Sequence, residues 1–284
     1  MATPTLLDYL HQLRKQGVSH IEIDDPARSV LRELYTRGSA RRPAPQKKPA
    51  TATPTPLSAT TAATTAATTA ATQIRATGHN PAEKIASLAA IANTWPPAKA
   101  LGSLRDTMVF SVGNPEADLM LVGEAPGYHD EQKREPFVGP SGVKLDQILS
   151  AMGLSRNEVY ISNVCKFRPA TKNQTINNRK PSPEEMATSI PFLKAEIDVV
   201  KPRAIIALGA SAAQGLLGSE KPLSQLRESW HQFQGIPLRV TFHPSYLLRQ
   251  EDGLGEKRKV WEDMLAAMEK LGLPVSKKQR AYFR

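Results

Sequence analysis

The segment DLMLVGEAPG, residues 118–127, joins a short apolar run to a turn built from glycine and proline. An apolar run of this length, bounded by turn residues, is typical of a buried strand in a parallel sheet. Gly123, Pro126 and Gly127 predict a tight, exposed turn directly after this strand. Backbone N–H groups in such a turn can point at a ligand oxygen. The segment matches neither the dinucleotide-binding nor the ATP-binding glycine motif.

Similar apolar runs recur along the chain, with helical patterns between them. The further strands are predicted at residues 159–163, 204–208 and 238–241, and the helices at 81–92, 142–152, 183–200, 210–217 and 257–271. Alternation of strands and helices implies right-handed crossovers with helices on both faces of the sheet. The sequence therefore predicts an α/β fold, a three-layer α/β/α sandwich around a central four-stranded parallel sheet. Ligands of such sheets bind beyond the carboxyl ends of the strands.

The chain divides into four parts by composition. Residues 1–38 predict a small helix–strand–helix segment, which at this size is marginal as an independent fold and is expected to dock on a partner protein. Residues 39–79 form a linker rich in proline, alanine and threonine, expected to be disordered because it has no apolar face to bury. The α/β domain spans 80–273, and a basic tail, expected to fray, spans 274–284.

Charge and cysteine content narrow the classes of function. The net charge of +10 favours a polyanionic partner, although a basic surface also serves solubility alone. The single cysteine, Cys165, excludes a disulfide within the chain and any all-cysteine metal site. Neither a signal peptide nor a run of ~18 apolar residues is present, so we expect a cytoplasmic protein with no membrane partner.

Three candidate site residues follow predicted strands or lie in the loops after them. Phe137 lies among glycines and prolines, where an aromatic ring either plugs the core or stacks on a flat ligand. Asn163 ends the second strand, and its amide either reads the edge of a base or caps the next loop. His243 follows the fourth strand and can donate a hydrogen bond to an oxygen that gains charge, although a lone histidine is more often structural.

Taken together and in order, these motifs make the chain resemble the uracil-DNA glycosylase superfamily, most closely its family 4, the iron–sulfur type. Several motifs in order are far more specific than any one of them. The matching segments are GEAPG (123–127), PFVGPSG (136–142), YISNVCKFRPA (160–170), ALGASAAQGLLG (207–218) and TFHPSYLLR (241–249). The resemblance implies a DNA repair enzyme, a monomer, that flips uracil out of DNA and hydrolyses its N-glycosidic bond.

The resemblance also implies roles for individual residues. Asp130 stands where the family's water-activating carboxylate stands, and His243 where the family stabilises the uracil O2 oxyanion. Phe137 would stack on uracil and Asn163 would read its edge, while the backbone of Gly123, Glu124 and Ala125 would line the pocket. The residues expected to contact DNA are Ser245, Leu247, Leu248 and Arg249.

The four cysteines that hold the family's cluster are missing. Their positions correspond to Pro96, Lys99, Phe167 and Ser189. Cys165 lies two residues from an expected ligand and cannot replace it. Because an iron–sulfur cluster needs thiolate ligands, we expect no cluster, no metal and no other cofactor. Phe167 is expected to fill the vacated space with apolar packing.

Two further departures lie close to the expected site. Asp130 stands where the family usually has glutamate, and Glu131, which follows it, is a possible substitute. Arg134 stands where the family usually has glycine, and a positive φ there would strain the loop.

These departures leave alternatives open. One is a catalytically weak or inactive module of the same fold that binds damaged DNA without turnover. Another is a scaffold whose residues 1–38 recruit a repair or replication protein. If the enzyme is active, no lysine stands in the matched motif positions as a nucleophile, so we expect a monofunctional glycosylase that processes U·G pairs before U·A.

Overall fold

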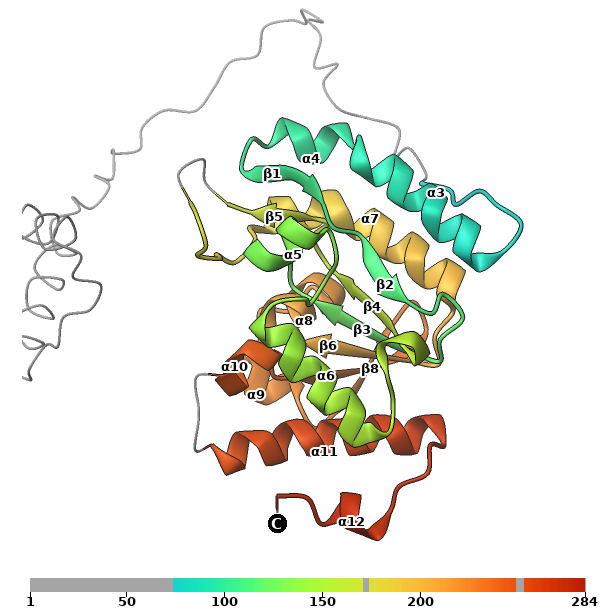
Figure 1. Ribbon diagram of the computed structural model, residues 1–284, viewed down its shortest axis with the longest axis vertical. Helices are drawn as coiled ribbons and strands as arrows, with labels where there is room; N and C mark the ends of the chain where they lie inside the picture. The colour runs from blue at the N-terminus through green and yellow to red at the C-terminus, as the bar shows by residue number, and fades with distance from the viewer. Residues whose placement is uncertain (1–73, 171–173, 249–252, 284) are drawn as a thin grey trace, which may run out of the picture. The chain divides into compact units, whose positions relative to one another are not determined.

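Four parallel strands form the centre of the computed structural model, which describes residues 74–170, 174–248 and 253–283. They are β3 (Leu119–Gly123), β4 (Tyr160–Asn163), β6 (Ala204–Leu208) and β8 (Ile236–Thr241). Two antiparallel edge strands extend the sheet, β2 (Ser111–Gly113) beside β4 and β7 (Trp230–Phe233) beside β8. The order within the described sheet is β2-β4-β3-β6-β8-β7 (Figure 1). The predicted α/β fold with four central parallel strands is confirmed, and the edge strands were missed.

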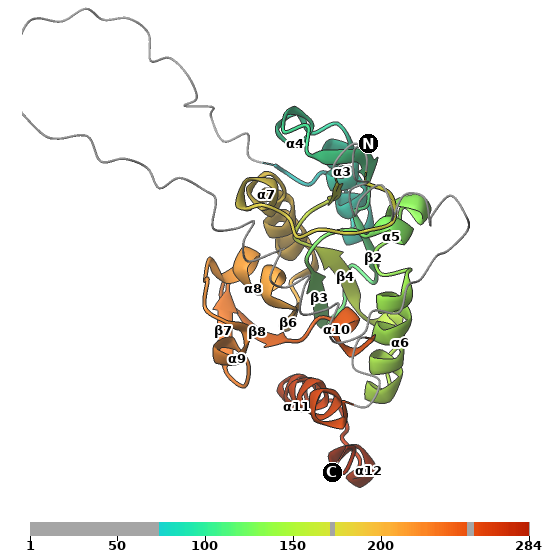
Figure 2. The same ribbon diagram turned by 90° about the vertical axis from the view of Figure 1, so that its left-hand side faces the viewer.

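Helices cover both faces of this sheet. Figure 2 shows α6 on one side of the strands and α7 and α8 on the other. The bounds of the helices in the described residues are α3 (Pro81–Asn93), α4 (Pro96–Ala100), α5 (Tyr128–Lys133), α6 (Pro140–Met152), α7 (Pro183–Val200), α8 (Ala210–Leu217), α9 (Leu223–Leu226), α10 (Pro244–Leu248), α11 (Leu254–Leu271) and α12 (Lys277–Arg280). The resulting three layers are the architecture that the strand–helix alternation predicts.

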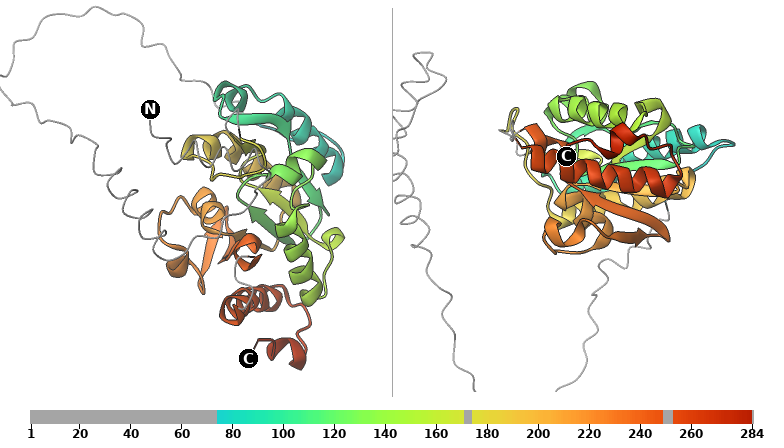
Figure 3. Two further views of the ribbon diagram at one scale, coloured as in Figure 1. Left: turned by 60° about the vertical axis from the view of Figure 1, so that its left-hand side comes forward. Right: turned by 90° about the horizontal axis from the view of Figure 1, so that it is seen from below.

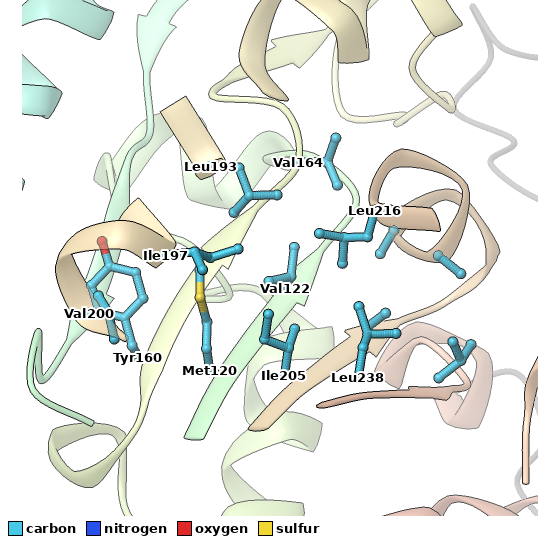
Figure 4. Packing of buried hydrophobic residues seen from close by; sticks show 14 of the residues in the cluster. Met120, Val122, Tyr160, Val164, Leu193, Ile197, Val200, Ile205, Leu216 and Leu238 are labelled. Atoms are coloured by element: carbon cyan, nitrogen blue, oxygen red, sulfur yellow. The ribbon is translucent and has the colours of Figure 1, made fainter. Parts of the chain in front are cut away.

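Side-chain alternation along β3 divides the core into two apolar clusters. Met120 and Val122 point to the face covered by α7 and α8, where they meet Leu193 and Leu216 (Figure 4). Leu119 and Leu121 belong to the opposite cluster, which α6 and α11 cover. Because successive residues of a strand point to opposite faces, an uninterrupted apolar run is what a strand buried on both sides requires.

A second, two-stranded sheet lies beside the main one. Its antiparallel strands are β1 (Leu104–Met108) and β5 (Phe167–Pro169). Helix α3 packs nearby on α7 through Leu88 and Ala92, and Trp95 meets the Phe192 ring edge to face at 5.2 Å. The sequence did not predict these two strands, because β1 carries arginine, aspartate and threonine and has no apolar run.

The C-terminal segment packs against the domain, contrary to the frayed tail that we expected. The Trp261 indole of α11 donates to the backbone oxygen of Gln279 at 2.7 Å, and the Gln279 amide donates to the Ala151 oxygen at 2.9 Å. Tyr282 stacks at an angle on Trp261, so α12 lies beside α11 (Figure 3). The predicted segment 1–38 and linker residues 39–73 lie outside the described residues. Where the structure is described, no helix combines the length and apolar character of a membrane span.

The loop after α5 gives the first test. Arg134 ends this helix in the left-handed region, with φ 55° and ψ 32°. That conformation costs a non-glycine residue ~1–2 kcal/mol, and the greater freedom of glycine in the unfolded chain offsets roughly half of the gain. We expect Arg134→Gly to stabilise the domain by about 0.5–1 kcal/mol, measured by urea unfolding. The neighbouring helical position is the control, since Lys133→Gly should destabilise by ~1 kcal/mol. A lower unfolding midpoint for Arg134→Gly would show that the loop is not strained.

Candidate active site

A cavity of about 430 Å³ opens at the carboxyl end of the sheet. The turn after β3, the loop before α6 and the segment after β8 all line it, as the alternating topology requires. Among its lining residues are Glu124, Ala125, Asp130, Phe137, His243 and Ser245. The motifs that the sequence places after the first and fourth strands thus meet at one cavity, whose lining does not include Asn163.

Gly123 brings two of the expected ligand-binding side chains together. It ends β3 and pairs in register with Asn163, which ends the neighbouring strand β4. A Cβ at Gly123 would overlap Asn163 Oδ1 and would lie 2.5 Å from Phe137 Cζ. The missing side chain therefore lets the asparagine amide and the phenylalanine ring approach the same point of the backbone.

The backbone around Phe137 holds its ring in the cavity wall. Phe137 has φ 58°, an uncommon left-handed conformation, and its side chain is buried. Arg156 donates to the carbonyl oxygens of Pro136 and Phe137, which fixes the loop from below. A Cβ on Gly142 would overlap the Phe137 carbonyl, so glycine is required at the start of α6. The ring stacks on the His243 imidazole with centroids 5.7 Å apart and planes inclined by 29°.

The Asn163 amide lacks hydrogen bonds although it is buried. The residue is 1% exposed, and neither Oδ1 nor Nδ2 has a partner among the described residues. Leaving such a group unsatisfied costs about 1–3 kcal/mol, so buried polar atoms without partners are rare in folded proteins. An amide with one acceptor and two donors is suited to a planar ligand with a complementary edge.

His243 presents a neutral imidazole to the cavity. The Ser245 backbone N–H lies 3.2 Å from Nδ1 and the Ser245 hydroxyl lies 2.8 Å from it. Since an N–H can only donate, Nδ1 accepts and the ring proton is assigned to Nε2. Burial lowers the pKa of His243 to about 4, although the nearby Asp130 carboxylate acts in the opposite direction. At neutral pH the ring is therefore an uncharged hydrogen-bond donor.

Asp130 is held by the backbone on both of its oxygens. It occupies the third position of α5, where Oδ2 accepts from the Gly127 N–H at 3.0 Å. Its Oδ1 accepts from the Val138 N–H at 2.9 Å, which ties the start of α5 to the loop that carries Phe137. A carboxylate accepts about four hydrogen bonds, so two remaining lone pairs can hold a water molecule in the cavity.

The Glu124 side chain also reaches the cavity. Burial raises the pKa of its carboxyl, while a hydrogen bond with Ser211 and the charge of Lys180 lower it. We expected Gly123 and Glu124 to act through the backbone. Their carbonyl oxygens accept from the N–H groups of Val164 and Cys165, which extends the pairing of β3 with β4, and Gly123 is not among the residues that line the cavity. Glu124 therefore contributes its side chain to the cavity wall.

The segment after β8 differs from the expected surface for DNA. Leu247 is only 6% exposed and packs in the apolar cluster under α6 and α11, so its predicted contact with DNA is wrong. The cause is the helical turn of α10, which points adjacent side chains about 100° apart. Tyr246 and Leu248 are exposed instead. Ser245 lines the cavity and orients His243, and Arg249 lies outside the described residues.

Glu131 cannot replace Asp130, as the sequence had left open. Its side chain points away from the cavity and is 6% exposed. It forms ion pairs with Arg105 at 3.1 Å and with Arg168 at 2.9 Å. Arg168 in turn donates to the Thr175 backbone oxygen at 2.6 Å, which anchors the following loop.

That loop supplies cavity residues that the sequence analysis missed. Asn178, Arg179 and Lys180 line the cavity, and the Asn178 side chain accepts from the Tyr128 N–H at 3.1 Å. The sequence did offer a signal for this loop: residues 177–180, NNRK, are polar and basic and lie between two motif segments without an apolar period. Loops of this kind on a rigid scaffold often carry functional residues. Tyr246, to which the sequence analysis gave no role of its own, also lines the cavity and stacks on Phe242 at 4.9 Å.

Comparisons with known proteins match the part of the chain that forms this site. A family model described as the uracil DNA glycosylase superfamily matches residues 110–265. A type-4 uracil-DNA glycosylase of Thermotoga maritima is 39% identical over 149 residues, 51% of this chain and 73% of that protein. One of Pyrobaculum aerophilum is 36% identical over 168 residues, 56% of this chain and 82% of that protein. A type-5 uracil-DNA glycosylase of Thermus thermophilus is 31% identical over 137 residues, 43% of this chain and 58% of that protein.

The protonation of His243 can be measured directly. In a pH titration followed by ¹H–¹³C NMR, we expect its imidazole to titrate at a pKa of about 4 in the folded protein. In the urea-unfolded chain the value should return to about 6.5. Because the unfolded state then binds the proton more tightly between these values, His243 lowers the stability as the pH falls from about 6.5 to 4. His243→Gln should make that part of the stability–pH curve flatter. A folded-state pKa above 6 would contradict the neutral donor.

Proposed function

The chain belongs to the uracil-DNA glycosylase superfamily, and from that premise we propose that it hydrolyses the N-glycosidic bond of uracil in DNA. The observation that carries the proposal is the buried Asn163 amide without hydrogen-bond partners, beside the Phe137 ring. Uracil offers an acceptor at O4 and a donor at N3, which this amide can satisfy at the same time. Cytosine presents the reverse pattern and would leave the amide unpaired.

Base flipping follows from the depth of the site. Asn163 is buried behind the turn at Gly123, and a base stacked in a duplex cannot reach it. We propose that uracil leaves the helix and enters the cavity, with Phe137 against its face. Extruding a base costs a few kcal/mol and costs least for mismatched pairs, so U·G should react before U·A.

His243 and Asp130 would have different roles in breaking the glycosidic bond. As the glycosidic bond breaks, the electron pair passes to uracil, and negative charge develops at N1 and O2. The neutral His243 carries its ring proton on Nε2, from which it would donate a hydrogen bond to O2 and stabilise this charge. Asp130, with its carboxylate fixed by Gly127 and Val138, would orient water towards C1′ of the sugar.

The reaction is proposed to stop at an abasic site. Strand cleavage by a bifunctional glycosylase needs an amine nucleophile at the sugar. Lys180 reaches the cavity lining, but it follows the Asn178 loop and lies outside the motif positions that address the base. We assign it to the DNA phosphates, which its exposed ammonium can neutralise.

A cluster does not fit this chain. The residues at the four cysteine positions of the resembled family are Pro96, Lys99, Phe167 and Ser189, none of which supplies a thiolate. Phe167 is 2% exposed, and the Ser189 hydroxyl accepts the Lys166 N–H at 3.2 Å. Both side chains thus have structural contacts of their own. We propose that the enzyme works as a monomer without an iron–sulfur cluster or other cofactor.

Asp130 provides the test of activity. Asp130→Asn keeps the size of the side chain but removes its charge and one acceptor, so we expect kcat to fall about 10²–10⁴-fold with little change in KM. The assay measures release of uracil from a labelled oligonucleotide with one U·G pair, followed by alkaline cleavage of abasic sites. Strand breaks should appear only after the alkali.

Two comparisons make this test decisive. Glu131→Gln alters an adjacent carboxylate that faces away from the cavity, so its kcat for uracil release should stay within about threefold of wild type at a temperature where it remains folded. Folded wild-type protein that binds U·G oligonucleotides but releases no uracil would identify a damage-binding module instead of an enzyme.

A further inference from the structure

A fully buried lysine lies directly behind the strand end that carries Asn163. Lys166 and Glu196 are both completely buried, and their Nζ and Oε1 atoms are 2.5 Å apart. The same Nζ donates to the Ser162 hydroxyl at 2.7 Å and to the Asn163 backbone oxygen at 3.0 Å. Two hydrogen bonds and one ion-pair contact thus surround the nitrogen, which suits the three donors of an ammonium group. The Glu196 carboxylate oxygens themselves have no hydrogen-bond partner among the described residues.

Burying this ion pair costs folding free energy, which suggests that the pair has a role other than stability. Removing two charges from water is expensive, and an apolar pair of similar volume is often as stable or more so. The aromatic face of Phe110, 4.9 Å from Nζ, recovers part of that cost. Neither charged group touches the cavity.

Only the third contact of Lys166 leads to the site. We propose that Lys166 and Glu196 are positioning residues, which fix the Asn163 peptide and thereby aim its amide at the base; this inference rests on the function proposed above. The lysine holds the Asn163 carbonyl from behind. The Val164 N–H donates to Gly123 and the Cys165 N–H to Glu124, so the Asn163–Val164 peptide and the peptide that follows it are also held by β3.

Helix α7 contacts both the side chain and the main chain of Lys166. Glu196 and Ser189 both lie on α7, and the Ser189 hydroxyl accepts the Lys166 backbone N–H. The backbone oxygen of Lys166 accepts from Val109 at 2.8 Å. The lysine is therefore held at its main chain and at its side chain by elements outside the cavity, and it transmits their position to Asn163.

Removing one charge alone would not test this role. Lys166→Met leaves a buried, unpaired carboxylate and is expected to unfold the domain. The informative variant is the double substitution Lys166→Met with Glu196→Leu, which replaces the ion pair by apolar side chains of similar size. We expect this variant to fold with a melting temperature near that of wild type. The Asn163 carbonyl then lacks a partner, and the Asn163–Val164 peptide is held only through its N–H.

The expected effect falls on the chemical step. A displacement of ~1 Å at a reacting group can lower a rate ~100-fold, so kcat for uracil release should fall about 10–100-fold. The KM for the U·G oligonucleotide should change by less than about threefold, because the contacts with the DNA backbone are intact. Leu193→Ala, a cavity-forming substitution in the core face of α7, is the matched control. It should lower the melting temperature while kcat remains within about threefold at a permissive temperature.

The position of the amide can be read without any turnover. In protein labelled with ¹⁵N-asparagine, the Asn163 side-chain NH₂ pair, assigned by its loss in Asn163→Asp, should shift or broaden in the double variant and stay in place in Leu193→Ala. A folded double variant with wild-type kcat and unchanged Asn163 signals would overturn the positioning role and leave a purely structural ion pair. An inactive wild type whose Asn163 signals still shift in the double variant would refute the proposed function and uphold the positioning.

Discussion

At Gly123 a hydrogen atom occupies the place where a side chain would overlap the Asn163 amide and press on the Phe137 ring. The parallel pairing of β3 with β4 brings Gly123 and Asn163 to the same level of the sheet, so this close approach is fixed by backbone hydrogen bonds. Every other feature of the site is arranged around it. The Phe137 loop and the segment with His243 both line the cavity, and the Phe137 and His243 rings stack on each other.

The same loop shows how the backbone is forced into place. Phe137 and Arg134 both have positive φ, and each costs folding free energy that the surroundings must supply. The hydrogen bonds of Asp130 with Gly127 and Val138, and that of Arg156 with the Phe137 carbonyl, offset this cost. Asp130 consequently has two tasks, holding the loop and facing the cavity. A shorter carboxylate than the glutamate of the resembled family suits the first task, because its oxygens meet N–H groups on the loop itself.

The inner strands were predictable because they are buried largely on both faces, which gives apolar runs such as 119–122 and 204–208. Strand β7 was not, since alternate residues such as Trp230 and Gln232 are exposed and no run forms. Its hairpin with β8 turns at Gln234 and Gly235, both with positive φ. Asparagine before glycine is the usual sequence signal for such a turn, and glutamine in its place does not predict one. In the site, motif order brought together Asp130, Phe137 and His243, which line the cavity, and Asn163, which lies beside Phe137 at Gly123; their roles stay predictions. It could not show that Leu247 turns inward, because that depends on the phase of a single helical turn.

The buried charges support the proposal that the domain works without a metal centre. A cluster ties separate loops together through four strong bonds to one small object, and its loss must be offset by contacts between the same segments. Here Ser189 of α7 holds the Lys166 main chain, while Glu131 and Arg168 join α5 to β5. Ion pairs of this kind add little net stability, since desolvation cancels much of the attraction, but they are directional and penalise any displacement that separates the charges. Such geometry provides position more than energy, which is what an asparagine that must meet one edge of one base requires.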